Sequence, residues 1–315
     1  MTPLVLTVII PVYKTVATLD RCVESVLSQA AGCELILVDD GSPDACGDLC
    51  DRWAERSDRI SVVHQPNRGL SAARNSGIAR SHAPYVTFVD SDDVLQPHTL
   101  PPLLALLAVH PDYDLVEYPV EIHYGSPRCH QLALADAVYT DWRRYWLDAR
   151  AYTHTYACNK VFRRSLFDHC LFPEGLTFED AWLLPRLLPH CRAIATVTTG
   201  LYRYYDNPQG ITRTATAADL SLLLAAHCHV LPLVSNADYY AHVVNVALDV
   251  YHATGRVPSL PRLPYWHTPK LLINRLLGFR FLCRLHHEFR PLCAYSRKTV
   301  RAAVQTLSVY ISQHA

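Results

Sequence analysis

The first 115 residues alternate between short apolar runs and segments in which apolar residues recur every three or four positions. Residues 4–10 are continuously apolar and rich in β-branched side chains, which is typical of a strand buried on both faces. In residues 19–27 the apolar positions fall at i, i+3, i+4, i+7 and i+8, which predicts an amphipathic helix. The alternation continues with predicted strands at 34–38, 60–64 and 85–89 and predicted helices at 48–56 and 70–81. Because strands alternate with helices, we expect an α/β fold with a doubly wound, mostly parallel sheet.

The pattern changes after residue 93. Helices are predicted at 97–109 and 178–188, one or two strands at 113–124, and a strand-like segment at 194–205. From residue 219 onward the patterns are only helical, with a proline-rich link at 257–264. We therefore expect a first domain over residues 1–216 and an all-helical C-terminal extension over residues 217–315.

Composition narrows the classes of function. Half of the 315 residues are apolar and 18% are charged, which excludes a disordered chain. The 29 basic and 29 acidic residues balance, so no nucleic-acid partner is expected. No apolar stretch reaches the roughly 18 residues of a membrane-spanning helix. Eleven cysteines are scattered without a C-x-x-C pair, which favours reduced thiols and a cytoplasmic location.

The charges are distributed unevenly along the chain. Residues 270–315 hold eight Lys or Arg and one acidic residue, Glu288, so residues 1–269 are acidic overall. Apolar residues lie between the basic ones over 270–301, which favours a peripheral contact with the anionic inner face of the cytoplasmic membrane. These apolar residues spread widely around a helical wheel, however. Packing on the first domain, or an interface of a homo-oligomer, explains the pattern equally well.

Three polar clusters follow three of the predicted parallel strands. They are Pro11-Val12-Tyr13, Asp39-Asp40-Gly41-Ser42 and Asp90-Ser91-Asp92-Asp93. Ligands of open α/β sheets bind outside the carboxyl ends of the strands, where these clusters would meet. Each cluster alone is typical of a turn or a solvated acidic stretch, but the coincidence of three at one edge favours a binding site.

The spacing of Asp90 and Asp92 predicts a metal site. Alternate residues of an extended segment point the same way, so the two carboxylates can face one site. Hard oxygen ligands suit Mg²⁺ or Mn²⁺, which can screen the charge of a diphosphate and stabilise its departure. The sequence contains no glycine-rich phosphate loop, so phosphate binding must rest on the metal and on side chains.

Seven motifs follow one another over about residues 5–214. In chain order they are PVYK, LVDDGSPD, NRGLSAARNSGI, YVTFVDSDD, NKVFRRSLF, FPEGLTFEDAWLLPRLL and LYRYYDNPQGIT. As an ordered set they resemble glycosyltransferase family two. The resemblance implies a GT-A (Rossmann-like) fold and an inverting hexosyl- or N-acetylhexosaminyl-transferase of bacterial surface-polysaccharide synthesis. The donor would be a nucleotide-diphosphate sugar, usually a UDP-sugar, and the acceptor a hydroxyl of a glycan or lipid-linked glycan.

The resemblance also implies roles for individual residues. The donor would be held by Pro11, Val12 and Tyr13, by Asp39 or Asp40, by Arg74 beside the base or the phosphates, and by the Asp90-Ser91-Asp92 segment. Within that segment Asp90 would approach the ribose and Asp92 would ligate Mn²⁺ or Mg²⁺, with Asp90 as the second candidate ligand. Asp180, next to Glu179, would be the general base that takes the proton of the acceptor hydroxyl.

The chemistry of a carboxylate base is consistent with that role. An aspartate is ionised at neutral pH and needs to accept the proton only late in the transition state. The competing interpretation is that Glu179 and Asp180 are an acidic first turn, favoured by the helix dipole. The pairs Asn159-Lys160 and Arg163-Arg164 could touch phosphate or acceptor, or form part of a basic surface.

Two other functions fit parts of the sequence. Residues 90–94 match D-x-D-x-V, the nucleophile loop of haloacid-dehalogenase-like phosphatases, but that loop belongs on an early strand. It would also leave the other two acidic clusters unexplained. The non-enzymatic alternative is a nucleotide-sugar-binding or scaffold subunit of a polysaccharide assembly complex, with an inactive site.

Overall fold

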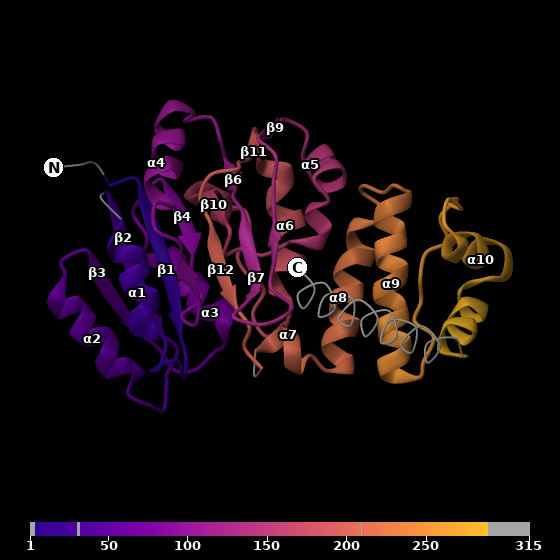
Figure 1. The fold of residues 1–315 in the computed structure, drawn as a ribbon, viewed down its shortest axis with the longest axis horizontal. Helices are drawn as coiled ribbons and strands as arrows, with labels where there is room; N and C mark the ends of the chain where they lie inside the picture. The colour runs from indigo at the N-terminus through magenta and orange to yellow at the C-terminus, as the bar shows by residue number, and fades with distance from the viewer. Residues whose placement is uncertain (1–3, 30–31, 209, 289–315) are drawn as a thin grey trace, which may run out of the picture. The chain divides into compact units, whose positions relative to one another are not determined.

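A computed structural model describes residues 4–29, 32–208 and 210–288 of the chain. It divides into two units, Met1–Ala215 and Thr216–Ala315 (Figure 1). The division falls one residue before the boundary expected from the sequence.

The first unit is built on an eight-stranded sheet in the order β3-β2-β1-β4-β10-β6-β11-β9. Its strands are β1 (Leu6–Val12), β2 (Cys33–Asp39), β3 (Ile60–His64), β4 (Tyr85–Phe88), β6 (Leu115–Glu117), β9 (Ala137–Tyr139), β10 (Lys160–Arg163) and β11 (Ile194–Thr196). β1 to β4 pair in parallel, as does β6 with β11, whereas β10 runs antiparallel between β4 and β6. The mostly parallel sheet predicted from the sequence is confirmed.

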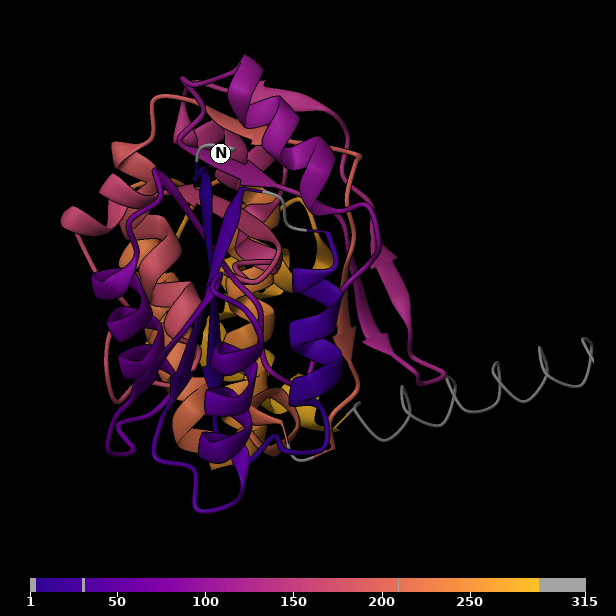
Figure 2. The ribbon, with the colours of Figure 1, turned by 90° about the vertical axis from the view of Figure 1, so that its left-hand side faces the viewer.

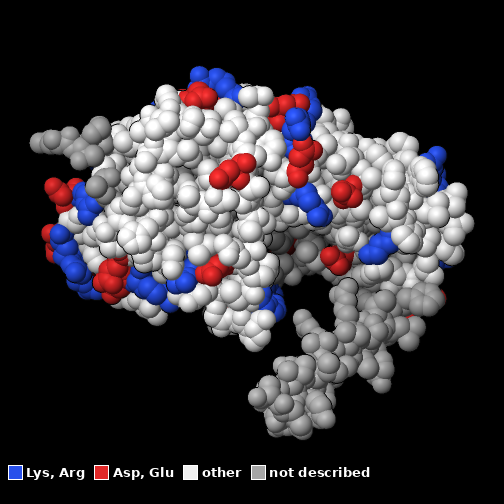
Figure 3. Space-filling view, turned by 45° about the horizontal axis from the view of Figure 1, so that its top comes forward, with Lys and Arg blue, Asp and Glu red and all other residues white. Residues whose placement is uncertain are grey.

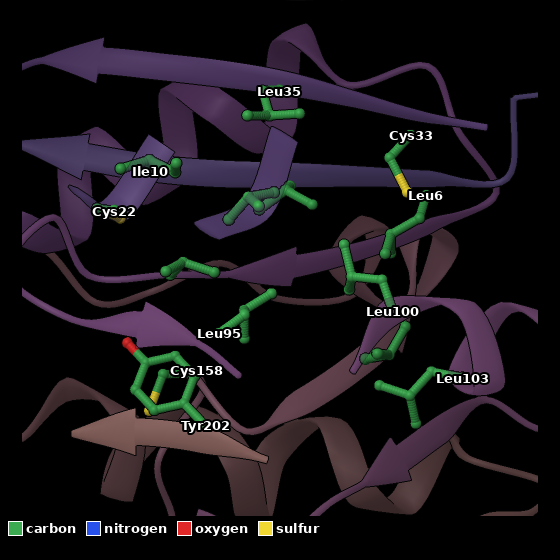
Figure 4. Close-up of a cluster of buried hydrophobic side chains, with 14 of the residues drawn as sticks. Leu6, Ile10, Cys22, Cys33, Leu35, Leu95, Leu100, Leu103, Cys158 and Tyr202 are labelled. Carbon is green, nitrogen blue, oxygen red and sulfur yellow. The ribbon is translucent and has the colours of Figure 1, made fainter. Parts of the chain in front are cut away.

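Helices cover both faces of this sheet, as Figure 2 shows around β1 and β2. α1 (Leu19–Leu27), α2 (Cys46–Arg56) and α4 (Leu100–Val109) share one apolar cluster with alternate residues of β1, among them Leu6 and Ile10 (Figure 4). α3 (Leu70–Arg80) lies on the opposite face. A Cβ at Gly77 would lie 2.4 Å from Ile9 Cγ2, so glycine is what lets α3 approach β1 so closely.

A second sheet of four short strands flanks the first, in the order β5-β12-β7-β8. It contains β5 (Val94–Leu95), β7 (Val120–Tyr124), β8 (His130–Leu132) and β12 (Tyr202–Tyr205). The segment 194–205, expected as one strand, is instead two strands in different sheets. Gly200 lies between them with φ of 84°, a backbone conformation that breaks an extended strand and favours glycine.

Shorter elements complete the first unit. They are α5 (Trp142–Asp148), α6 (Glu179–Leu187), α7 (Ile211–Thr214) and three 3₁₀ turns, η1 (Ala151–Thr153), η2 (Arg164–Asp168) and η3 (Leu188–His190).

On the face drawn in Figure 3, acidic and basic side chains are interspersed with wide uncharged areas, in keeping with the low charged fraction of the sequence.

The second unit is helical, as predicted. α8 (Ala217–Val230) and α9 (Ala237–Thr254) pack against each other, and α10 (Pro269–Leu277) follows the proline-rich link. Thr216 and Asp219 form a capping box at the start of α8, and Asn236 and Thr268 cap the other two helices. No helix among the described residues is long and apolar enough to cross a bilayer. Of the eight basic residues between 270 and 315, four lie outside the described residues: Arg290, Arg297, Lys298 and Arg301.

Candidate active site

The three polar clusters meet at the carboxyl edge of β1, β2 and β4. Thr15, just after β1, donates from its hydroxyl to Ser91 Oγ at 3.0 Å. The backbone N–H of Lys14 lies 3.4 Å from Ser42 Oγ in the second cluster. Parallel pairing of β1 with both neighbours therefore brings together segments that are up to 80 residues apart in sequence.

Asp39 and Asp40 are buried and shape the loops around the edge. The carboxylate of Asp40 accepts hydrogen bonds from Gln65 Nε2 at 2.7 Å and from the backbone N–H groups of Arg68 at 3.0 Å and Gly69 at 2.7 Å. Asp39 accepts from the Ser42 N–H at 3.0 Å and pairs with His64. Hydrogen bonds from the His64 ring to the carboxylates of Asp51 and Asp39 raise the pKa of His64.

Tyr13 is the exposed member of the clusters expected to hold a nucleotide base. Its side chain is 41% exposed, whereas Pro11, Val12, Asp39 and Asp40 are buried. The Lys14 ammonium lies 5.0 Å from the centre of the Tyr13 ring. An exposed ring at a sheet edge can stack on a flat base, while the buried acids hold the neighbouring loops through Ser42, Arg68 and Gly69.

The Asp90–Asp93 segment is a turn, closed by a 2.9 Å hydrogen bond from the Asp93 N–H to the Asp90 carbonyl. The prediction that Asp90 to Asp92 are extended is therefore wrong. Burial, and after it the charge of Asp90, raise the pKa of Asp92. Asn207 donates from Nδ2 to Asp92 Oδ2 at 2.9 Å.

Asp93 has a structural environment of its own. It is completely buried and accepts hydrogen bonds from the Tyr202 hydroxyl and the Tyr205 N–H, each at 2.8 Å. Figure 4 shows the Tyr202 hydroxyl directed toward the carboxyl ends of β1 and β2. Burial, Asp92 and Asp90 raise the pKa of Asp93 well above its usual range. Asp93 thus anchors the turn to β12 and leaves Asp90 and Asp92 at the edge.

Arg74 connects this turn to the start of α6. The guanidinium is 2% exposed; Nη1 donates to Glu179 Oε1 at 2.7 Å and Asp180 Oδ1 at 3.1 Å, and Nη2 donates to Asp90 Oδ1 at 2.9 Å. Its cation also lies 5.1 Å from the centre of the Phe172 ring. Burial opposes the charge of Arg74, but the three carboxylates outweigh it and raise its pKa. Arg74, which the sequence places beside the base or the phosphates, therefore pairs with three carboxylates instead.

Glu179 and Asp180 differ in their access to solvent. The side chain of Glu179 is 8% exposed and that of Asp180 is 19% exposed. Three carboxylates surround one guanidinium, and burial together with Asp180 raises the pKa of Glu179 to about 7. Asp180 also accepts a 3.1 Å hydrogen bond on Oδ2 from the backbone N–H of Ala157. Of the two, Asp180 is the carboxylate better placed to meet a substrate.

The donor set at this edge suits a hard divalent cation in an open site. Among the described residues, no group of three His, Cys, Asp or Glu side chains could hold a metal. Asp92 and Asp90 supply carboxylate oxygens, the ligands that Mg²⁺ and Mn²⁺ prefer, and Mg²⁺ takes the rest of its shell from phosphates and water. These residues fit a cation that arrives with a diphosphate.

Two residues that contact the turn were not predicted from the sequence, Asn207 and Arg21. Asn207 lies inside the last of the seven motifs, so its place in that motif could have indicated it. Arg21 donates from Nη2 to the Asp92 carbonyl at 2.8 Å and its guanidinium lies 3.9 Å from the centre of the Tyr205 ring. In the sequence Arg21 is one polar residue of an amphipathic helix, and nothing local distinguishes it.

Comparison with known proteins identifies the family. Residues 7–171 match the family model described as glycosyl transferase family 2, which is more than half of the chain. The chain belongs to glycosyl transferase family 2. The prediction of a family-two glycosyltransferase, made from the ordered motifs, is confirmed.

Several curated proteins of this kind are similar to the chain. Glycosyltransferase GlyA of Streptococcus pneumoniae serotype 4 is 27% identical over 280 residues, 81% of this chain and 39% of GlyA. The uncharacterized glycosyltransferase EpsJ of Bacillus subtilis is 30% identical over 221 residues, 67% of this chain and 64% of EpsJ. The minor teichoic acid biosynthesis protein GgaB of B. subtilis is 27% identical over 67% of this chain and 24% of GgaB. The chain therefore spans less than two thirds of the length of these relatives.

Solved structures similar to this chain show the same fold. S. aureus TarS 1–349 in complex with UDP-GlcNAc aligns with a TM-score of 0.65 at 17% identity, covering 91% of this chain and 92% of that chain. TarS 1–349 in complex with UDP aligns with a TM-score of 0.59 at 19% identity, over 93% and 87% of the two chains. The GT-A fold expected from the motifs is thereby confirmed.

Proposed function

We propose that the chain transfers a sugar, with inversion, from a UDP-sugar to a hydroxyl of a glycan or lipid-linked glycan. The observation that carries this proposal is the accessible Asp180 carboxylate, joined through one guanidinium to Asp90 at the donor edge. As the acceptor oxygen bonds to the anomeric carbon, its proton passes to Asp180 and the bond from that carbon to the diphosphate breaks. The products are the extended acceptor, a protonated Asp180 and UDP.

The donor would be bound by the edge of the sheet. Tyr13 would stack on the base; Pro11, Val12, Asp39, Asp40 and Ser91 would shape its pocket. UDP as the nucleotide is supported by the structures of TarS with UDP and UDP-GlcNAc, which share the fold. Asp92, with Asp90 as second ligand, would hold Mn²⁺ or Mg²⁺, which screens diphosphate charge when bound. A role in polymer synthesis is supported by the name of the relative GgaB.

A panel of UDP-sugars tests the proposed activity. We expect one donor to be hydrolysed slowly in the presence of Mn²⁺ or Mg²⁺, and hydrolysis to stop with excess EDTA. Isothermal titration with UDP provides a binding control. Binding of UDP without turnover of any donor, with the panel offered acceptor glycans as well, would favour the inactive scaffold subunit instead. Absence of both binding and turnover would contradict the proposal altogether.

For the C-terminal helical unit we propose contact with an anionic membrane from the cytoplasmic side. Three leucines of α10 are exposed, Leu272 at 42%, Leu276 at 70% and Leu277 at 58%, and Phe281 beyond it at 45%. Lys270, Arg275, Arg280 and Arg284 lie in the same stretch, and no acidic residue occurs between 270 and 287. Apolar side chains beside basic ones match a bilayer surface that carries negative charge.

Co-sedimentation with liposomes tests the membrane contact. We expect the protein to bind vesicles containing phosphatidylglycerol at low salt and to be released at about 1 M salt, where screening acts within about 3 Å. Arg280→Glu with Arg284→Glu should weaken binding, since each basic residue near the surface contributes about 1 kcal/mol. Failure to bind, combined with a mass that rises with protein concentration, would point to a homo-oligomer interface instead.

A further inference from the structure

A fully buried ion pair joins β10 to β6. Lys160 on β10 is directly opposite Glu117 on β6 in the sheet register, and both side chains are 0% exposed. Lys160 Nζ is 2.8 Å from Glu117 Oε1. Neither residue can reach a substrate, so the sequence-based idea that Asn159-Lys160 touches phosphate or acceptor is wrong.

The ammonium of Lys160 also organises the chain that precedes it. It donates to the carbonyls of His154 at 2.9 Å and Tyr156 at 2.7 Å, and to Asn159 Oδ1 at 3.1 Å. These oxygens belong to the segment 154–159, which curls around the ammonium. The Lys160 N–H donates to the Ala157 carbonyl at 3.2 Å, so side chain and backbone of one residue fix the segment.

Glu117 ties the same segment to the sheet. Its Oε1 is 2.8 Å from His154 Nδ1 and accepts from Asn159 Nδ2 at 3.2 Å. Its Oε2 accepts from the Tyr145 hydroxyl at 2.6 Å. Burial disfavours the charge of Glu117, but Lys160 and His154 outweigh it and hold its pKa well below the usual range. Glu117 is thus ionised and satisfied at both oxygens.

The segment held in this way ends at the proposed base. The Ala157 N–H donates to Asp180 Oδ2 at 3.1 Å, while Arg74 holds Oδ1 on the other side. We propose that Lys160 and Glu117 are positioning residues for transfer: they fix the Ala157 peptide so that its N–H orients the Asp180 carboxylate. The inference rests on the proposed function, in which Asp180 is the base.

The charges around Asp180 are consistent with this role. Burial raises the pKa of Asp180, and Arg74, the Ala157 N–H and Lys160 each oppose that rise. Asp90 acts in the same direction as burial, and Glu179 shares the Arg74 guanidinium. Two of the three opposing influences, the Ala157 N–H and the ammonium, depend on Lys160. Loss of Lys160 would therefore leave Asp180 both less well oriented and more easily protonated.

A role limited to stability explains the pair less well. A buried ion pair is weak evidence for stability, because desolvation of both charges offsets much of their attraction, and apolar replacements are often neutral. Here most hydrogen bonds of the pair go to three residues of the segment 154–159, and the Ala157 N–H of that segment donates to Asp180. Misplacement of a catalytic group by about 1 Å can cost about 100-fold in rate.

Two variants test the positioning role. Lys160→Met removes the ammonium, and Lys160→Met with Glu117→Gln removes both charges, so that no unpaired carboxylate is left buried. We expect kcat for transfer to fall about 100-fold in the double variant, with unchanged affinity for UDP. The acid limb of the kcat–pH profile should move to higher pH, because Asp180 is then more easily protonated.

Arg163→Met is the matched control. Arg163 lies three residues further along β10 and pairs with the buried Asp114 at the opposite end of the strand. This control should lower the melting temperature and leave the pH profile in place. If the double variant also lost stability but kept the wild-type acid limb and kcat per folded molecule, the pair would be structural only. Asp180→Asn is measured alongside these variants. Near-normal transfer in Asp180→Asn would refute Asp180 as the base. If transfer collapses in Asp180→Asn but the double variant keeps the wild-type pH profile, only the positioning role is refuted.

Discussion

Asp180→Asn is expected to lower kcat for sugar transfer by about 10²–10⁴-fold, the contribution typical of a positioned general base. Affinity for UDP should be unchanged, because in the proposed mechanism Asp180 meets the acceptor, whereas Asp90 and Asp92 meet the donor. The variant should also fold normally. Arg74 keeps Asp90 and Glu179 as partners, and removal of one of three carboxylates relieves repulsion. Initial rates with saturating donor and acceptor, together with titration of UDP, measure both quantities.

The pH dependence gives a second readout for Asp180. The base works when ionised, so transfer should decline as the pH falls through its pKa. Burial raises that pKa, so the decline should start at a higher pH than for an ordinary aspartate with a pKa of about 4. In Asp180→Asn the residual rate should lose this acid limb.

Glu179→Gln is the matched control for Asp180. Glu179 shares the Arg74 guanidinium but is less exposed, so its substitution should lower transfer much less. The reverse outcome, collapse in Glu179→Gln with near-normal transfer in Asp180→Asn, would make Glu179 the base. Near-normal transfer in both variants would contradict a mechanism in which either carboxylate is the general base.

The parts of the fold that the sequence predicts are those set by local patterns. The apolar run at residues 4–10 and the period of residues 19–27 each specify an element without help from distant residues, and both appear nearly where expected. The three polar clusters could also be found, because each lies at the carboxyl end of its own strand. Parallel pairing then brings the clusters to one edge whatever happens in the rest of the chain.

Long-range pairing accounts for what the sequence could not predict. β10 inserts antiparallel between β4 and β6, and its four residues, KVFR, carry no strong strand pattern of their own. Arg74 finds Glu179 and Asp180 more than 100 residues away, so its place among carboxylates is invisible in its own motif. The buried Lys160–Glu117 pair depends on the register between β10 and β6, which is likewise a property of the folded sheet.

Substitution of Asp92 should have opposite effects on stability and on ligand binding. The reason is that Asp90, Asp92 and Asp93 lie in one short turn at the edge of the sheet. Burial and Asp90 raise the pKa of Asp92, which means that its charge is unfavourable in the ligand-free protein. Neutralising Asp92 should therefore stabilise the ligand-free protein or leave it unchanged. Asn207 can still donate to the amide oxygen of an asparagine placed there.

Asp92→Asn should lose metal-dependent donor binding while its ligand-free melting temperature stays the same or rises. Removing one partner of a desolvated charge pair costs about 2–5 kcal/mol, so UDP affinity with Mn²⁺ should fall by about 30-fold or more. In the wild type, UDP with Mn²⁺ at about 100 times Kd should add about 2.7 kcal/mol to the free energy of unfolding. Thermal unfolding with UDP, with Mn²⁺ and with both measures this. At the same ligand concentration a 30-fold weaker Kd leaves about 0.9 kcal/mol, so the combined shift in Asp92→Asn should fall from about 2.7 to about 0.9 kcal/mol or less. Asp112→Asn is the matched control, since it removes an exposed acid just before β6, at the opposite edge of the sheet, and should keep the full shift. A full shift in Asp92→Asn as well would show that the cation is held elsewhere.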